Sequence, residues 1–303
     1  MKSLLLTAVL DTPWAILPTK LTAIVGLLAR HAAGERLSAD DVAAVTARPT
    51  APRAPGAVAV LPLFGTLAPR ANLMTENSGG TSLERFTQAF RSAVISGDVR
   101  AIVLDIDSPG GAVAGVEELA ADIYRARGIK PIVAVADHLA ASAAYWIATA
   151  ADEVVMSPSA EVGSIGVFAA HEDVSRALET AGVTTTLISA GKFKTEGNPY
   201  EPLSAEARAA MQTRVDEYYT MFVKAVARGR GAKIDDVRAG FGEGRVVGAR
   251  EALRLGMADR VATLDEVIAD LQKPNRAGRG LSADSRGLSV TSRARRFRLA
   301  TRL

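Results

Sequence analysis

The sequence predicts an α/β protein built on a sheet of parallel strands. From Ala57 onward, short apolar runs typical of buried strands alternate with segments whose apolar residues recur every three or four positions, as in amphipathic helices. Ala, Val and Leu carry most of the apolar content, because aromatic residues make up only 5% of the chain. With 48% hydrophobic and 23% charged residues, a chain of 303 residues can bury a sizeable core.

Residues 1–55 are predicted to form a helical appendage with a proline-rich linker. Helical spacing of apolar residues predicts an amphipathic helix over 19–32, and Ser38 is placed to cap a short second helix. The opening run MKSLLLTAVL looks superficially like a secretory leader, but it is short and lacks a small-x-small cleavage site. We therefore expect a cytoplasmic chain. No membrane span is expected either, since no segment approaches roughly 18 uninterrupted apolar residues.

Residues 56–272 form the predicted α/β body. Strands are expected over 58–63, 101–106, 131–136, 153–156 and 184–189. Helices are expected over 83–94, 116–127, 174–181, 204–228 and 264–271, with a further helix after Ser142. Pro62 is expected to break the first strand, and Thr81 with Glu84 has the spacing of a capping box for the first helix.

Residues 273–303 form a strongly basic tail. It holds nine Lys or Arg residues against one acidic residue, although the formal net charge of the whole chain is only +3. Because this tail lacks apolar periodicity, we predict that it is disordered in isolation. It is expected either to contact DNA or an acidic protein surface, or merely to keep the chain soluble.

The residue types that are absent or rare exclude several kinds of site. The chain contains no cysteine, which excludes thiol proteases, cysteine-based zinc sites and disulfides. It contains only three histidines, so a site with several histidine ligands is not expected. We expect neither a metal nor another cofactor.

Candidate chemistry lies in three loops that follow predicted strands. In open α/β sheets, ligands bind at the carboxyl ends of the strands, so these loops are expected to converge. The first loop contains Gly110 and Gly111, which let the backbone approach a ligand closely. It lacks the lysine and the spacing of a phosphate-binding loop, so nucleotide binding is a poor fit.

The second loop is centred on Ser142, and the third contains Lys192 and Lys194. A serine between a strand and a helix lies near outward-pointing N–H groups, which favours a nucleophile because these groups also stabilise an oxyanion. The alternative is an ordinary N-cap serine that opens the helix. A lysine acts as a general base only where burial or a positive neighbour lowers its pKa. A triad with His171 as the base also stays open, although the spacing does not support it.

Four stretches together resemble one known family. They are LDIDSPGGAVAG, HLAASAAYWIATAADEVVMSPSAEVGSIGV, ISAGKFKTEGNPYEPLS and GRVVGAREALRLGMADRV. In this order and spacing they resemble the signal peptide peptidase A (protease IV) family over residues 58–271. The resemblance implies a ClpP/crotonase-like fold of repeated strand-strand-helix units, and a serine peptidase with a Ser–Lys dyad.

By the same resemblance, the nucleophile falls on Ser142 and the general base on Lys194, the second lysine of GKFK. Lys192 has no counterpart in the family and is expected to be a solvated neighbour. In relatives of this length the two groups come from neighbouring subunits of a ring. The resemblance therefore implies a homo-oligomer that is inactive as a monomer.

The resemblance also assigns the groups around the nucleophile. The backbone N–H groups of Gly111 and Ala143 are the expected oxyanion donors, and Gly110 and Ser164 are expected to support the site. The Ser164 hydroxyl is placed to orient the amine of the lysine. The chain departs from the family at Ala143-Ala144, where many members carry two glycines, but the small size is kept.

The opening TPWAILPTKL and the loop GNPYEPLS look like phage and prophage members of the family. Those members are capsid-assembly proteases that digest scaffold during head maturation. This implies protein or peptide substrates, capsid or scaffold partners, and a place in the host cytoplasm or the prohead.

Three alternatives stay open. The first is a cellular protease like the signal-peptide peptidases. The second is a catalytically silent structural component of a capsid, for which loss of Ser142 or Lys194 would be expected. The third is a crotonase-like acyl-CoA enzyme, which the missing acidic residues in the matching loops disfavour.

Overall fold

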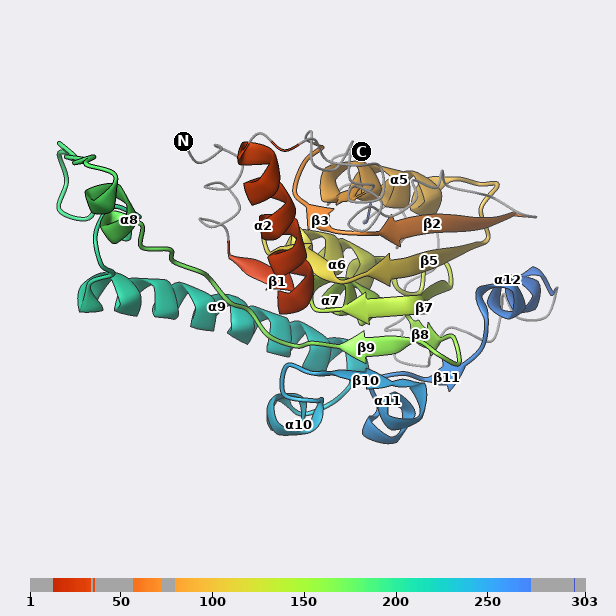
Figure 1. Cartoon of the computed structure of the whole chain (residues 1–303). Coiled ribbons are helices and arrows are strands. Elements are labelled where there is room, and N and C mark those ends of the chain that lie inside the picture. The colour runs from red at the N-terminus through yellow and green to blue at the C-terminus, as the bar shows by residue number, and fades with distance from the viewer. Residues whose placement is uncertain (1–12, 34, 36–56, 72–79, 274–296, 298–303) are drawn as a thin grey trace.

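The structure is a computed structural model that describes residues 13–33, 35, 57–71, 80–273 and 297 (Figure 1). The expected helix after Ser38, the proline-rich linker and almost all of the basic tail lie outside these residues. The amphipathic helix of the appendage is present as α2 (Pro18–Ala32). Its first residue is a proline, which suits the first helical turn because no N–H is needed there. No described helix is both long and apolar enough to cross a membrane.

The centre of the molecule is a sheet whose main strands run in parallel, in the order β10-β9-β7-β5-β2. The strands are β2 (Val58–Phe64), β5 (Ala101–Ser108), β7 (Ile132–Ala141), β9 (Glu161–Gly163) and β10 (Val246–Gly248). The first part of β7 pairs with β8 (Glu153–Met156), which also pairs with β11 (Arg260–Val261). The second part of β7 pairs with β9. Only β10 among these is antiparallel to its neighbour, so the α/β fold with parallel pairing is confirmed.

The expectation that Pro62 breaks the first strand was wrong. Strand β2 runs through Pro62, which lies opposite Asp105 in β5. The reason is the position of β2 at the edge of the sheet, where it pairs only with β5. An edge strand tolerates proline, because one of its two sides forms no ladder in which an N–H is needed.

Alternate residues of the sheet face two different apolar layers. Ile102, Leu104 and Ile106 belong to the larger core, which also includes residues of α5, α6, α7 and α9. Val103 and its neighbours on the opposite face pack with Val267 of α12 in a smaller cluster. This alternation follows from the two-residue period of a strand and explains why the central strands are apolar on both sides.

The predicted helices of the body all form close to their predicted ranges, and α10 and α11 are present in addition. The helices are α5 (Leu83–Ile95), α6 (Val116–Ala126), α7 (Ala143–Ala148), α8 (Ser175–Thr180), α9 (Ala205–Arg230), α10 (Ile234–Gly240), α11 (Ala249–Leu255) and α12 (Leu264–Gln272). Ser204 caps α9 as predicted, since its hydroxyl accepts from Ala207 N. The predicted capping box at Thr81 was wrong: Ser82 caps α5, and the Thr81 hydroxyl instead bonds to the backbone of Phe64.

A second, small sheet has the order β1-β6-β3-β4. Its strands are β1 (Trp14–Ile16), β6 (Gly110–Ala112), β3 (Leu67–Ala68) and β4 (Thr81–Ser82). The loop that contains Gly110 and Gly111 is therefore itself a strand, and the N-terminal appendage supplies its antiparallel neighbour.

The predicted strand over 184–189 does not form. Residues 181–194, between α8 and α9, are exposed throughout and include no helix or strand. Figure 1 shows this segment, together with α8, projecting at the outer end of α9 and away from the sheet. We call residues 170–204 the arm. An apolar segment without a neighbouring strand in its own chain cannot complete a ladder, although its sequence has strand character.

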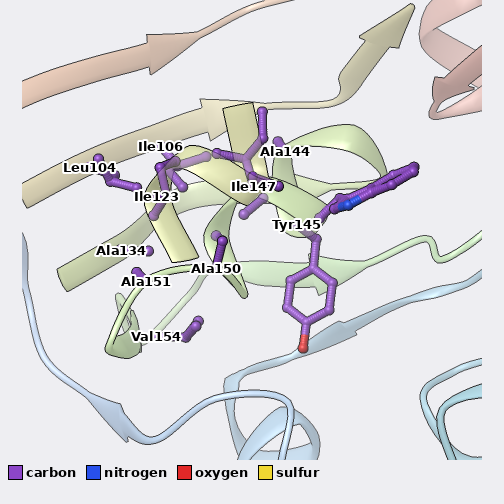
Figure 2. Close-up of a cluster of buried hydrophobic side chains, with 14 of the residues drawn as sticks. Leu104, Ile106, Ile123, Ala134, Ala144, Tyr145, Ile147, Ala150, Ala151 and Val154 are labelled. Atoms are coloured by element: carbon purple, nitrogen blue, oxygen red, sulfur yellow. The ribbon is translucent and has the colours of Figure 1, made fainter. Parts of the chain in front are cut away.

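Helix α7 is held in the core by two aromatic side chains. Trp146 stacks on Phe222 of α9 with ring centroids 4.7 Å apart, and its Nε1 donates to Glu117 of α6 over 3.1 Å. The Tyr145 hydroxyl donates to Met257 O over 2.8 Å. Figure 2 shows the Tyr145 ring extending away from Ile106 and Ile123.

An ion pair ties the end of α9 to the edge of the sheet. Arg230 donates to both carboxylate oxygens of Asp259 over 2.8 and 2.7 Å, and Asp259 also accepts from Val154 N over 2.7 Å. Burial raises the pKa of Asp259, but these hydrogen bonds outweigh it and hold that pKa below its usual value. The group therefore stabilises the fold above its unfolded-state pKa.

We expect Asp259→Asn to lower the free energy of unfolding near neutral pH by about 1–2 kcal/mol, because the carboxylate is partly screened by water. In the parent protein, this contribution should begin to fall near the unfolded-state pKa of about 3.9 and be lost as pH drops through the lowered folded-state pKa. Urea titrations at several pH values measure both effects. The exposed Asp98→Asn variant is the control, and equal pH profiles for the two variants would contradict the prediction.

Candidate functional site

Ser142 lies at the turn between β7 and α7 in a backbone conformation that non-glycine residues rarely adopt. Its φ is 56° and its ψ is −121°. Its N–H donates to Gly163 O over 2.7 Å, and its carbonyl accepts from Trp146 N over 3.0 Å, so bonds on both sides hold the turn. Strain of this kind costs on the order of 1–3 kcal/mol and is often found at functional sites.

The Ser142 hydroxyl does not cap the helix that follows. Ser142 occupies the N-cap position of α7, but its side chain makes no capping bond. Instead Oγ lies 3.4 Å from Gly166 O, at the upper end of hydrogen-bond distance. The N-cap interpretation is therefore correct for the position and wrong for the side chain. The hydroxyl is not engaged by the helix backbone, and it points toward the segment that follows β9.

The glycine strand β6 packs directly against Ser142. A Cβ on Gly110 would stand 3.0 Å from Ser142 Cβ and 2.2 Å from Ala15 O, and its φ is +97°. A Cβ on Gly111 would stand 2.0 Å from Leu67 O. Neither position has room for a side chain, so two of the three predicted loops do converge.

Ser108 is a residue of this site that the sequence did not single out. It is buried, its hydroxyl donates to Gly65 O over 2.6 Å, and it accepts from Gly110 N over 3.2 Å. It thereby ties the start of β6 to the end of β2. The only signal in the sequence was its position beside Pro109 in the glycine loop.

The segment after β9 forms another wall of the site. Ser164 is buried, has φ 52°, and donates its N–H to Arg245 O over 2.8 Å. Its neighbours Gly163 and Gly166 supply the carbonyls that Ser142 contacts. The structure thus brings Gly110, Gly111, Ala143 and Ser164 around Ser142.

Lys194 is not brought to Ser142 within the chain. It is exposed and belongs to the arm, which Figure 1 shows at the outer end of α9, far from α7. Lys192, also on the arm, pairs with Glu206 over 3.1 Å and lies over the Phe193 ring at 4.4 Å. The structure therefore distinguishes the two lysines: Lys192 has a partner carboxylate in its own chain.

Two of the three histidines, His138 and His171, have their contacts away from Ser142. His171 Nε2 lies 3.1 Å from Asn198 O, within the arm. His138 Nδ1 lies 3.7 Å from Asp107 and 3.4 Å from Asp137. Burial raises the pKa of Asp107, and His138 and Lys20 partly offset it. Among the described residues, no group of three or more His, Asp or Glu side chains could hold a metal ion.

Comparison with known proteins gives a family match. The model of Peptidase family S49 matches residues 125–277, a range that includes Ser142, Ser164 and Lys194. The head-tail preconnector protein GP5 of Enterobacteria phage P21 is 37% identical over 212 residues, which cover 70% of this chain and 42% of that protein. Capsid assembly protease C of Escherichia phage lambda is 34% identical over 243 residues, 78% of this chain and 55% of that protein. The chain spans about half the length of these two relatives.

A solved structure with a similar course of the chain is an enoyl-CoA hydratase/isomerase family protein from Silicibacter pomeroyi. It is 17% identical, with a TM-score of 0.46, over 84% of this chain and 89% of that one.

We expect Gly111→Ala to lower the free energy of unfolding by about 2–3 kcal/mol, because its Cβ would meet the backbone of Leu67. The matched control is Gly26→Ala in α2, where a Cβ would meet nothing within 4 Å. That variant should be more stable than the parent by about 0.5–1 kcal/mol, since alanine is the better helix former. Urea denaturation measures both changes. A Gly111→Ala protein as stable as the Gly26→Ala protein would show that β6 does not lie this close to β3.

Proposed function

The chain belongs to peptidase family S49, and on that premise we propose that it is a serine endopeptidase with Ser142 as its nucleophile and Lys194 as its general base. The observation that carries the proposal is the conformation of Ser142. The residue is buried and strained at a strand-to-helix turn, its hydroxyl is not used for capping, and a strand of two glycines lies against it. A structural N-cap serine would need none of these features.

The proposed reaction is acyl transfer. The neutral amine of Lys194 takes the proton of Ser142 as Oγ attacks the carbonyl carbon of a peptide bond. The tetrahedral intermediate collapses, the C–N bond breaks, and the protonated lysine returns its proton to the leaving amine. Water, deprotonated by the same lysine, then attacks the acyl carbon. The bond between that carbon and Oγ breaks, and the lysine returns the proton to Oγ, which releases the second product and regenerates Ser142.

Two backbone N–H groups are proposed to stabilise the oxyanion. Ala143 is the first residue of α7, and the first four N–H groups of a helix have no acceptor within that helix. Gly111 lies in β6, which packs against the Ser142 turn. Removing one such donor typically costs about 3 kcal/mol of transition-state stabilisation. Ser164, from the opposite wall, is proposed to orient the lysine amine.

We propose that Lys194 reaches Ser142 from a second copy of the chain. Two features support this: the nucleophile is buried in the body, and the lysine lies on an exposed arm far from it. The arm also holds a group of large exposed apolar side chains, namely Val183, Leu187, Ile188, Phe193 and Tyr200, and Ile188 is 97% exposed. Apolar groups clustered on one projecting segment are typical of an interface. Docking would bury both these groups and the lysine, which favours a neutral amine.

The proposed role is capsid assembly in a phage or prophage. The two relatives described above carry the names of a capsid assembly protease and a head-tail preconnector protein. The substrates would be scaffold or other capsid proteins, and the reaction would take place in the host cytoplasm or within the prohead. The basic tail would dock on acidic protein or DNA. A cellular role is the second candidate, because a putative signal peptide peptidase of Enterococcus faecium is 28% identical over 58% of this chain.

We expect Ser142→Ala to lower the rate of casein digestion by at least about 10⁴-fold, because no nucleophile remains. Lys194→Ala should lower it by roughly 10³-fold, the size of a lost general base. Lys192→Ala is the matched control and should keep the parent rate. Mass spectrometry of casein and of the chain itself reports digestion and self-cleavage. Equal digestion by all four proteins would refute the mechanism, and digestion by none would favour the catalytically silent alternative.

The shared site makes a further prediction for mixed oligomers. When Ser142→Ala and Lys194→Ala chains are unfolded together and reassembled, about a quarter of the interfaces should combine an intact serine with an intact lysine. Casein digestion should then return to roughly that fraction of the parent rate. The control replaces the Lys194→Ala chain by the double variant, which offers no intact pair. A mixture as inactive as this control would show that both groups act within one chain.

A further inference from the structure

Strand β1 lies between two of the segments that form the walls around Ser142, and we call the space that it fills the groove. On one side it is antiparallel to β6, with Ala15 opposite Gly111 and Ile16 opposite Gly110. On the other side Trp14 and Phe168 exchange two backbone hydrogen bonds of 2.9 and 3.0 Å. Phe168 lies two residues after Gly166, the last residue of the segment 163–166 that contacts Ser142. Both neighbours of β1 thus belong to the walls of the candidate site.

The main chain of β1 comes close to the proposed reacting groups. The point at which a Cβ on Gly110 would stand lies 2.2 Å from Ala15 O and 3.0 Å from Ser142 Cβ, so both atoms flank the same point. Leu17 N donates to Pro109 O and Val113 N donates to Pro13 O. In an antiparallel ladder, residue pairs that share hydrogen bonds alternate with pairs that do not. The Ala15–Gly111 pair lies midway between these two bonded pairs and is therefore of the bonded kind, so the N–H of Gly111 is directed toward Ala15. A peptide carbonyl of the chain itself therefore stands where the proposed oxyanion donor points.

We propose that Trp14–Ile16 occupies the place of an extended substrate peptide, so that the chain in this conformation blocks its own site. Extended peptides bind proteins by adding a strand to an exposed strand edge. The groove between β6 and Phe168 is filled by one strand, so it cannot take a second. The proposal rests on the function proposed above, and it adds that β1 must leave the groove before a substrate enters.

The side chains of β1 explain how such a short strand stays in place. Trp14 and Ile16 are 5% and 2% exposed, and they pack with Leu21 and Ile24 of α2 and with Ala112. This cluster is separate from the larger core beneath the sheet. Ala15, the middle residue of β1, instead belongs to the larger core. Release of β1 would therefore break the small cluster and remove one methyl group from the larger core. The apparent affinity for a substrate equals the intrinsic affinity multiplied by the fraction of chains in which the groove is open.

A reversible disulfide tests the proposal directly. The two positions are Trp14 and Ala112, which lie opposite each other at a pair that does not share ladder bonds, where Cα atoms are closest. The chain has no cysteine of its own, so Trp14→Cys with Ala112→Cys introduces the only thiols. Oxidation locks β1 in the groove, and reduction releases it.

The readout is binding rather than hydrolysis, and it uses the full chain with Ser142→Ala added. The probe is a dye-labelled synthetic heptapeptide with the sequence of residues 12–18, TPWAILP, followed by fluorescence anisotropy. We expect the reduced protein to bind this peptide at least tenfold more tightly than the oxidised protein, and renewed oxidation to reverse the gain. Equal affinity in the two states would overturn the proposal.

A second pair of variants tests the proposal without a disulfide, in case the protein with two introduced cysteines does not fold. Ile16→Ala weakens the contacts of β1. Val267→Ala makes a comparable cavity in the separate cluster between α12 and the main sheet, which includes no residue of β1. Ile16→Ala should bind the heptapeptide at least fivefold more tightly than Val267→Ala, and equal binding would overturn the proposal. Labelling of Ser142 by a fluorophosphonate in the Ile16→Ala chain, in which Ser142 is intact and β1 is weakened, tests the proposed function separately. Failure of that labelling would refute the nucleophile without changing the peptide-binding result.

Discussion

The left-handed backbone of Ser142 is the constraint on which the rest of the site depends. A relaxed backbone would let the hydroxyl fold back and cap α7, as serine does at most helix starts. Instead the N–H of Ser142 is bound by Gly163 and its carbonyl by Trp146, so the turn is held from both sides. This geometry also brings β6 so close that Gly110 has no room for a Cβ. Small residues around the serine are thus a packing requirement of the turn.

The stability of the turn comes from the helix behind it. Tyr145 and Trp146 are fully buried and connect α7 to Met257 and to Phe222 of α9. Large aromatic side chains stabilise by burial and by stacking, which offsets a local strain of a few kcal/mol. The two aromatic residues that follow Ser142 in this helix therefore hold the serine in position. The proposed nucleophile thus stands at the start of one short helix, and the aromatic side chains that anchor this helix lie one turn later.

The arm separates Lys194 from Ser142 within the chain. The body is well packed around Ser142, but the segment that carries Lys194 projects from the far end of α9. Ile188 and Leu187 belong to the apolar run that predicted a strand there, and both side chains are exposed rather than packed against the body of the chain. The groove beside the serine, by contrast, is filled by β1. In this conformation an isolated chain thus has β1 beside Ser142, and Lys194 lies far from Ser142 on the arm.

The sequence by itself determined four strands of the parallel sheet, six of the helices around it, and the meeting of Ser142 with the glycine loop. Those features depend on local periodicity and on the rule that the ends of parallel strands share one edge of a sheet. Only the tertiary structure decided that Pro62 stays within a strand, because edge position is a property of the whole sheet. It also decided that residues 184–189 have no strand partner and that β1 fills the groove. Pairing between segments far apart in the chain depends on which strand edges have no partner once the sheet has formed, and the local sequence pattern does not determine this.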